Sequence, residues 1–159
     1  MNELEKNILL IETLQLLENP NVTEELLLGQ AEHINDLMEQ EEIDQYFIDT
    51  LYGAMLRNEP TNNYIIMANA LNNITEDEKD RLELRVLLRN VRISNNEQQS
   101  INFINAVIAK LQTKNYYDSE IINPTILLCY SAKRFDLLNN LYEALKDIKN
   151  DNLEIENNM

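Results

Sequence analysis

Two helix starts bracket the stretch TEDEKDRLELRVLLRNVRISNNE, residues 75–97. Thr75 is followed three residues later by Glu78, and Ser94 is followed in the same way by Glu97. This spacing is the capping-box pattern of a helix N-terminus. Between the two starts, apolar residues recur every three or four positions without a proline or glycine. The stretch therefore predicts one complete helix and the beginning of the next.

The three prolines mark further helix boundaries, and the scarcity of glycine argues against strands. The 159 residues include only two glycines and three prolines, too few for the tight turns of a strand-rich fold. Each proline lies between segments with a helical apolar period, which predicts a helix boundary there. The predicted helices cover about 2–18, 24–40, 42–58, 62–73, 76–93, 95–113, 124–132 and 135–150.

These segments predict an all-α fold, a compact single-domain bundle of seven or eight helices over residues 1–150, with stacked αα-hairpins as one form of it. A chain of this length can bury roughly 70% of the surface that its unfolded form exposes. The hydrophobic fraction of 44% is typical of a globular protein. We expect residues 151–159 to form a frayed polar tail.

Two expectations concern single helices. In the first helix, Leu4, Ile8, Ile11 and Leu14 form one apolar stripe, widened by Leu10 and Leu17, which predicts the side that faces the core. Gly53 lies inside the third predicted helix without a turn signal around it. We interpret this glycine as a point of close packing against a neighbouring helix.

The stretch from residue 124 to residue 145 predicts a helical hairpin. Its features are Pro124-Thr125, Leu128, Tyr130, then Arg134-Phe135-Asp136 at the turn and Leu141-Tyr142 in the second helix. With these residues it resembles a single pentatricopeptide-type or related helical-hairpin repeat, which implies two antiparallel helices. The sequence has no second copy at an offset of about 34–36 residues, and repeat folds need about three copies. The turn is expected at Lys133-Arg134.

Negative charge is concentrated at one end of the chain. The first fifty residues hold thirteen acids and one lysine, and therefore carry −12 of the net charge of −15. A one-sided field of this kind points to a partner of opposite sign. The candidate partner-binding residues gather near the end of the second predicted helix and the start of the third: Glu32, Asp36, Glu39, Glu41, Glu42 and Asp44. Like charges one turn apart repel each other and destabilise their own helix. A basic surface nearby would offset this repulsion.

A possible internal basic surface lies on the helix predicted at 76–93. Its arginines form a basic ridge within an arc of about 80°: Arg81, Arg85, Arg89 and Arg92. Three interpretations stay open. The basic ridge pairs with the acidic N-terminal helices, it contacts an acidic partner or nucleic acid, or it is solvated with its aliphatic stems over apolar surface.

The sequence lacks the patterns of several catalytic and metal-binding classes. Gly29 and Gly53 are too far apart for a phosphate-binding loop, and one cysteine with one histidine cannot complete a zinc site. Cys129 lies in an apolar run, which predicts a buried, inert thiol. His33 lies among carboxylates, which predicts a surface histidine. We therefore expect no catalytic residue, no metal and no cofactor, and hence no enzyme.

The leading hypothesis is a non-enzymatic acidic helical protein-binding module, such as an inhibitor, immunity protein or assembly factor, that docks on a basic partner. The alternatives are a nucleic-acid-mimicking inhibitor of a DNA-binding protein, a self-associating homodimer, and an enzyme with an unrecognised carboxylate pair. Direct binding of nucleic acid is not expected of so acidic a chain. Without a signal pattern or a run of about 20 apolar residues, we expect a cytoplasmic protein with no membrane partner. Abundant Asn and Ile, which have A/T-rich codons, are consistent with an A/T-rich genome, such as that of a low-GC bacterium, its phage or a large DNA virus.

Overall fold

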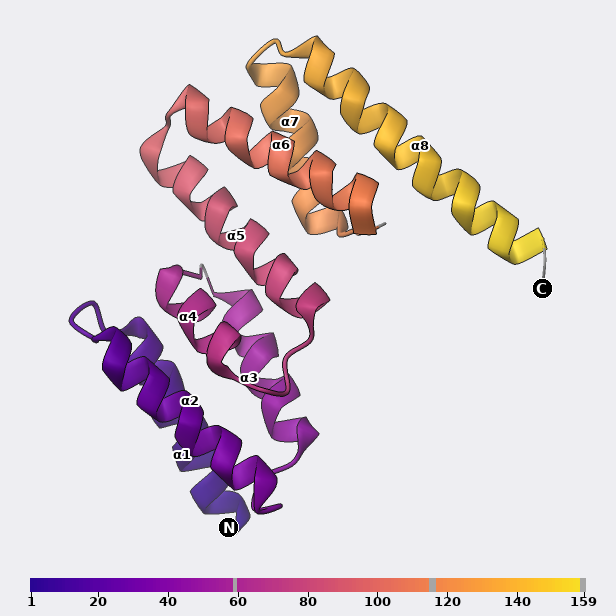
Figure 1. Ribbon diagram of the computed structural model, residues 1–159. Coiled ribbons are helices and arrows are strands. Elements are labelled where there is room, and N and C mark those ends of the chain that lie inside the picture. Colours follow the sequence, from indigo (N-terminus) through magenta and orange to yellow (C-terminus); the bar gives the residue numbers. More distant parts are fainter. Residues whose placement is uncertain (59, 115–116, 158–159) are drawn as a thin grey trace. The chain divides into compact units, whose positions relative to one another are not determined.

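A computed structural model describes residues 1–58, 60–114 and 117–157, with only the backbone described for 151–157. Within these ranges the chain is all helical, with eight α-helices and no strand (Figure 1). The helices are α1 (Glu3–Glu18), α2 (Glu24–Glu39), α3 (Gln45–Arg57), α4 (Asn62–Ala70), α5 (Glu76–Ser94), α6 (Glu97–Lys114), α7 (Ser119–Ser131) and α8 (Phe135–Asn157). The predicted all-α bundle is confirmed.

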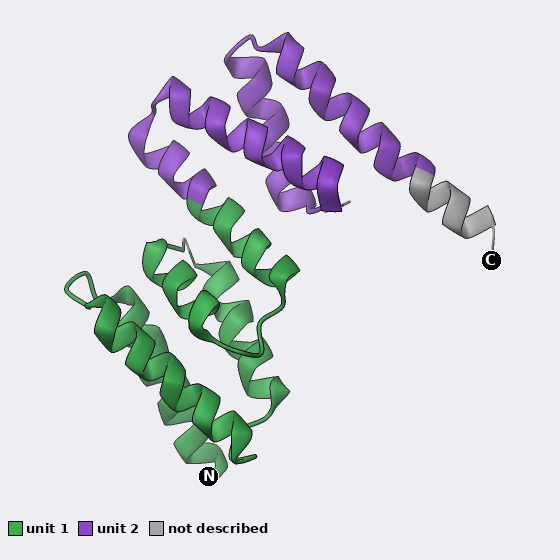
Figure 2. Ribbon diagram, viewed as in Figure 1, with its two compact units in different colours: residues 1–86 green, residues 87–159 purple. Residues whose placement is uncertain are grey.

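The helices pack within two compact units, residues 1–86 and 87–159, and α5 contributes to both (Figure 2). In the first unit α1 packs on α3 and contacts α2, and α2 packs on α4. In the second unit α6, α7 and α8 all pack against one another. A single domain over residues 1–150 stays a prediction.

The start of α5 follows from its capping box. The hydroxyl oxygen of Thr75 accepts a hydrogen bond from the amide of Glu78 at 3.2 Å. In return, the amide of Thr75 donates to the Glu78 carboxylate at 3.0 Å. Two amides that have no partner inside the helix are satisfied in this way.

The second capping box, at Ser94, is a wrong prediction. Ser94 is the last residue of α5, and Asn95 adopts a left-handed conformation with φ of 49° that ends the helix. The side chain of Asn96 accepts from the amides of Gln98 at 2.8 Å and Gln99 at 3.3 Å. Asn96 therefore caps α6 in place of Ser94, because asparagine is at least as good an N-cap as serine and Asn96 directly precedes the helix.

The helix predicted to start at Pro124 begins five residues earlier, at Ser119. The side chain of Asp118 accepts from the amide of Glu120 at 3.1 Å and caps this earlier start. Pro124 therefore lies in the second turn of α7 and not in the first. A proline there removes only one backbone hydrogen bond, to the carbonyl of Glu120, and α7 continues through it.

The turn between α7 and α8 is where the sequence predicted it. Lys133 adopts a left-handed conformation with φ of 55°, and its amide donates to the carbonyl of Tyr130 at 3.1 Å. The amide of Arg134 donates to the carbonyl of Cys129 at 2.9 Å, which completes a Schellman motif. The backbone of residues 151–157 continues α8, and residues 158–159 of the predicted tail lie outside the described residues.

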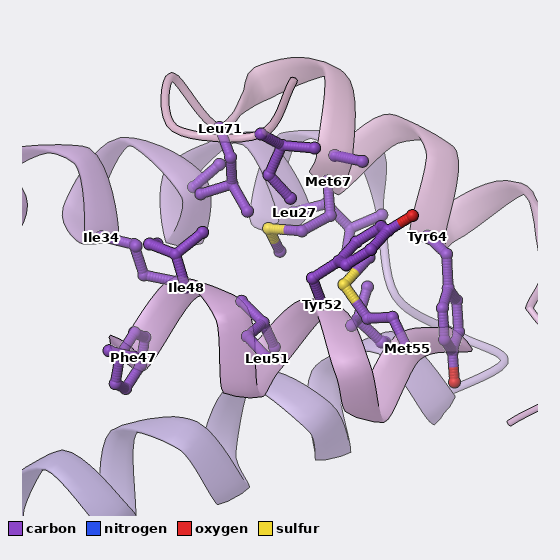
Figure 3. Packing of buried hydrophobic residues seen from close by; sticks show 14 of the residues in the cluster. Leu27, Ile34, Phe47, Ile48, Leu51, Tyr52, Met55, Tyr64, Met67 and Leu71 are labelled. Atoms are coloured by element: carbon purple, nitrogen blue, oxygen red, sulfur yellow. The ribbon is translucent and has the colours of Figure 1, made fainter. Parts of the chain in front are cut away.

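Side chains from α2, α3 and α4 form most of the core of the first unit (Figure 3). Its fully buried members include Leu27, Ile34, Leu51, Met55 and Met67. In the second unit Cys129 is fully buried, and this burial raises the pKa of its thiol.

The predicted core face of α1 is wrong for most of its residues, although Leu17 is buried and Leu10 is partly buried. Leu4, Ile8 and Ile11 are exposed, whereas the buried face consists of Leu9, Thr13 and Leu17. Leu14, the fourth residue of the predicted stripe, is partly buried. Apolar residues lie almost all round this helix, so their period alone does not select the side that packs.

Gly53 is not a point of close packing. A β-carbon added to it would meet no atom within 4 Å, so the neighbouring helices do not require glycine at this position. None of the described helices combines the length and the apolar content needed to cross a membrane.

Candidate functional site

The outer face of α2 carries a row of carboxylates. The helix buries Leu27, Ala31 and Ile34 against the core. On its opposite face an acidic row is exposed to solvent: Glu25, Glu32, Asp36 and Glu39. These four residues are separated by seven, four and three positions, so they lie on one side of the helix.

Three members of the acidic row, Glu32, Asp36 and Glu39, are among the residues predicted from the sequence, whereas Glu25 is not. The signal was present, because Glu25 lies two helical turns before Glu32 and therefore on the same face. Glu25 also lies in the first turn, where the helix dipole stabilises acidic side chains. That local role was enough to explain an acid at this position without a partner.

No described cation neutralises the acidic row. The helix itself contains no lysine or arginine. Among the residues that the structure describes, none of the four row side chains forms a hydrogen bond or an ion pair. Glu39 also lies in the last turn, where the helix dipole is already negative. The field of the row is therefore directed outward without compensation.

The remaining predicted acids lie in the connection to α3, and two of them make contacts inside the unit. The carboxylate of Glu42 accepts a hydrogen bond from the amino group of Met1, which lowers the pKa of Glu42. Asp44 caps α3 by accepting from the amide of Phe47 at 3.3 Å. These two acids are less available to a partner than the acidic row.

Glu41 is exposed, but its backbone has a structural role. It adopts a left-handed conformation with φ of 58° immediately after the end of α2. The amide of Glu41 donates to the carbonyl of Met38 at 3.1 Å, and that of Glu42 donates to Leu37 at 2.9 Å. This Schellman motif turns the chain from α2 toward α3.

An open hollow lies within the acidic row. It surrounds Gly29 and is bordered by Glu25, Glu32, Leu26 and Leu28. Both leucines are exposed, and no atom of another helix lies within 4 Å of the position that a β-carbon of Gly29 would occupy. Apolar walls between two carboxylates suit a lysine or arginine side chain, which has an aliphatic stem and a cationic end.

The basic ridge does not neutralise the acidic row within the first unit. Arg81 and Arg85 are half-buried there, and Arg85 donates from Nη1 to the carbonyl of Leu56 at 3.4 Å. None of the row carboxylates forms an ion pair with either arginine. In the second unit Arg89 is half-buried and Arg92 is exposed.

Other candidate groups lie apart from the acidic row or have a simple environment. His33 is exposed on α2, as predicted, and Asp80 on α5 is the one buried carboxylate of the described side chains. Across the described residues, no group of three or more His, Cys, Asp and Glu side chains is placed to hold a metal ion.

The chain matches no protein-family model, no curated protein and no solved structure.

Proposed function

We propose that this chain is a non-enzymatic, acidic helical module that docks on a basic surface of another protein through the acidic row of α2. Inhibitor, immunity and assembly-factor roles share this mode of action, in the cytoplasm or, for a viral protein, in the host cytoplasm. The supporting observation is that four carboxylates face solvent opposite the core, with no ion-pair partner among the described residues.

The carboxylates of the acidic row repel one another, and this repulsion is the physical reason to expect a cationic partner. Two carboxylates one helical turn apart, about 6 Å, repel by roughly 0.7 kcal/mol in water. Asp36 repels both Glu32 and Glu39 in this way, and no cation on the helix reduces the repulsion. A cationic partner removes the repulsion and adds attraction, which raises the association rate and favours basic partners over acidic ones.

The extent of the acidic row favours a protein partner over mimicry of nucleic acid. From Glu25 to Glu39 the row spans about 21 Å along one helix. A mimic of DNA should distribute carboxylates along a longer face to follow the phosphates of a duplex. A short row suits a local basic patch.

A pair of charge-matched variants tests this function. The row variant carries Glu32→Gln, Asp36→Asn and Glu39→Gln. The control variant carries Glu83→Gln, Glu143→Gln and Asp147→Asn, three exposed acids elsewhere with the same change in charge. Both variants and the unmodified chain are used in pull-downs from lysate of the source organism, at about 0.05 M and about 0.5 M salt.

The expected result is a basic protein that the unmodified chain and the control variant retain at low salt. The row variant should lose it, and so should every form of the chain at high salt. A partner that binds the row variant as well as the control would contradict the proposal. Displacement of the partner by duplex DNA would instead favour mimicry of nucleic acid.

A further inference from the structure

The outer face of α1 carries an exposed aliphatic stripe. Leu4, Ile8 and Ile11 expose 67%, 46% and 54% of their surface. Their spacing of four and three residues places them along one side of the helix, opposite the side that packs. We call these three residues the outer stripe. Exposed aliphatic side chains that follow one another at intervals of one helical turn form a continuous apolar patch, and such patches are typical of interaction sites.

Carboxylates border the outer stripe. Glu5 and Glu12 are exposed and follow Leu4 and Ile11 by one residue each, so both lie along the same edge of it. The one base of α1, Lys6, is half-buried on the other side of the helix, where it lies 3.6 Å from Glu3. The stripe is therefore apolar in the centre and acidic along one edge.

The outer stripe and the acidic row lie on two helices that contact each other. In the first unit α1 packs on α3 and α2 packs on α4, while α1 and α2 contact each other. Both helices bury their other faces in the core of the first unit, so both outer faces point away from that core. The first unit therefore exposes an aliphatic face on α1 and an acidic face on the adjacent α2.

We propose that the outer stripe is the apolar anchor of the docking surface and that it binds an amphipathic basic helix of the partner. The inference rests on the proposed function. The bound helix would present aliphatic residues at i, i+4 and i+7, with lysines or arginines beside them. Charge complementarity selects this occupant. A second copy of the chain would bring two regions of net charge −12 together, and an anionic membrane would repel the same surface.

The test uses the full chain and two labelled peptides of about 18 residues. One peptide places leucines on one face of a lysine-rich helix, and the other has the same composition in scrambled order. The stripe variant carries Leu4→Gln, Ile8→Gln and Ile11→Gln. Its matched control carries Leu127→Gln, Ile93→Gln and Ile126→Gln, one leucine and two isoleucines that are exposed elsewhere. Circular dichroism verifies that both variants fold.

Fluorescence anisotropy at low salt should show that the unmodified chain prefers the amphipathic peptide by about tenfold in Kd, equivalent to about 1.4 kcal/mol. The control keeps this preference, and the stripe variant loses it. A stripe variant with an unchanged preference overturns the inference. So does a dimer of the unmodified chain, or binding to anionic vesicles, that the same three substitutions abolish.

The row variant separates this inference from the proposed function. If the row variant binds both peptides weakly while the stripe variant keeps its preference, the acidic docking surface stands and the anchor is refuted. If the row variant binds both peptides normally and the stripe variant loses its preference, the anchor stands and docking through the acidic row is refuted.

Discussion

Gln30 on α2 donates from its Nε2 to the hydroxyl oxygen of Thr13 on α1 over 2.9 Å. Thr13 is fully buried and donates in turn to the carbonyl of Leu9 at 2.8 Å. One hydroxyl therefore links the two helices whose outer faces form the proposed docking surface. The bond joins the helix of the outer stripe to the helix of the acidic row.

Replacing Thr13 by valine should lower the free energy of unfolding by about 1 kcal/mol. Valine keeps the shape of the side chain, but the half-buried amide of Gln30 loses its acceptor. Urea denaturation measures the change. Thr50→Val is the control, because the Thr50 hydroxyl bonds only within its own helix, to the carbonyl of Tyr46 at 2.8 Å, and is exposed. Equal costs for the two substitutions would mean that the interhelical bond adds nothing.

Local signals were sufficient to predict the helices and their number. A capping box is a contact between residues three apart, and an apolar period is a property of one segment, so both can be found in the sequence. Boundaries were wrong where two local signals compete, as Ser94 does with Asn96 and Pro124 with Asp118. Only the folded structure shows which of the two residues begins the helix.

Packing partners were harder to predict than helices. Three sides of α1 carry apolar residues, so the burial of Leu9 and the exposure of Ile8 depend on where α3 lies. The acids of α2 were recognised from their spacing. The contacts of Glu42 and Asp44 depend on the path of the connection between two helices, which no short pattern encodes.

Arg85→Gln should destabilise the first unit by about 1–2 kcal/mol, whereas Arg92→Gln should change stability by less than about 0.5 kcal/mol. Arg85 is half-buried and reaches the carbonyl of Leu56, but Arg92 is exposed. Glutamine is too short to retain the contact, and it covers less apolar surface. Thermal and urea unfolding measure both variants. A loss of stability for Arg85→Gln as small as that for Arg92→Gln would show that the contact of Arg85 with the Leu56 carbonyl does not stabilise the unit.

Glu41→Gly should stabilise the chain relative to Glu41→Gln by about 1 kcal/mol. Both substitutions remove the same charge, but only glycine adopts the left-handed conformation at φ of 58° without steric cost. Urea midpoints of the two variants isolate this backbone effect. Two variants of equal stability would indicate that the turn does not hold a left-handed residue in solution.

The carboxyl group of Asp136 should titrate at a pKa of about 2, lowered from 3.8. The main cause is the guanidinium of Arg134, which donates from Nε to Oδ1 at 3.0 Å and from Nη2 to Oδ2 at 2.9 Å. A folded-state pKa below the unfolded value means that the pair stabilises the fold above about pH 4. This contribution is lost as the pH falls from 3.8 toward 2.

NMR titration of the side-chain carboxyl carbon measures this pKa directly. Arg134→Gln should return it toward 3.8, because both donors to the carboxylate are removed. Arg57→Gln, which removes an arginine from the other unit, should leave it unchanged. The difference in stability between the unmodified chain and Asp136→Asn should shrink over the same acid range. An Asp136 that titrates near 3.8 in the unmodified chain would show that the two side chains do not pair in solution, because the exposed carboxyl group has no stronger cause for a low pKa.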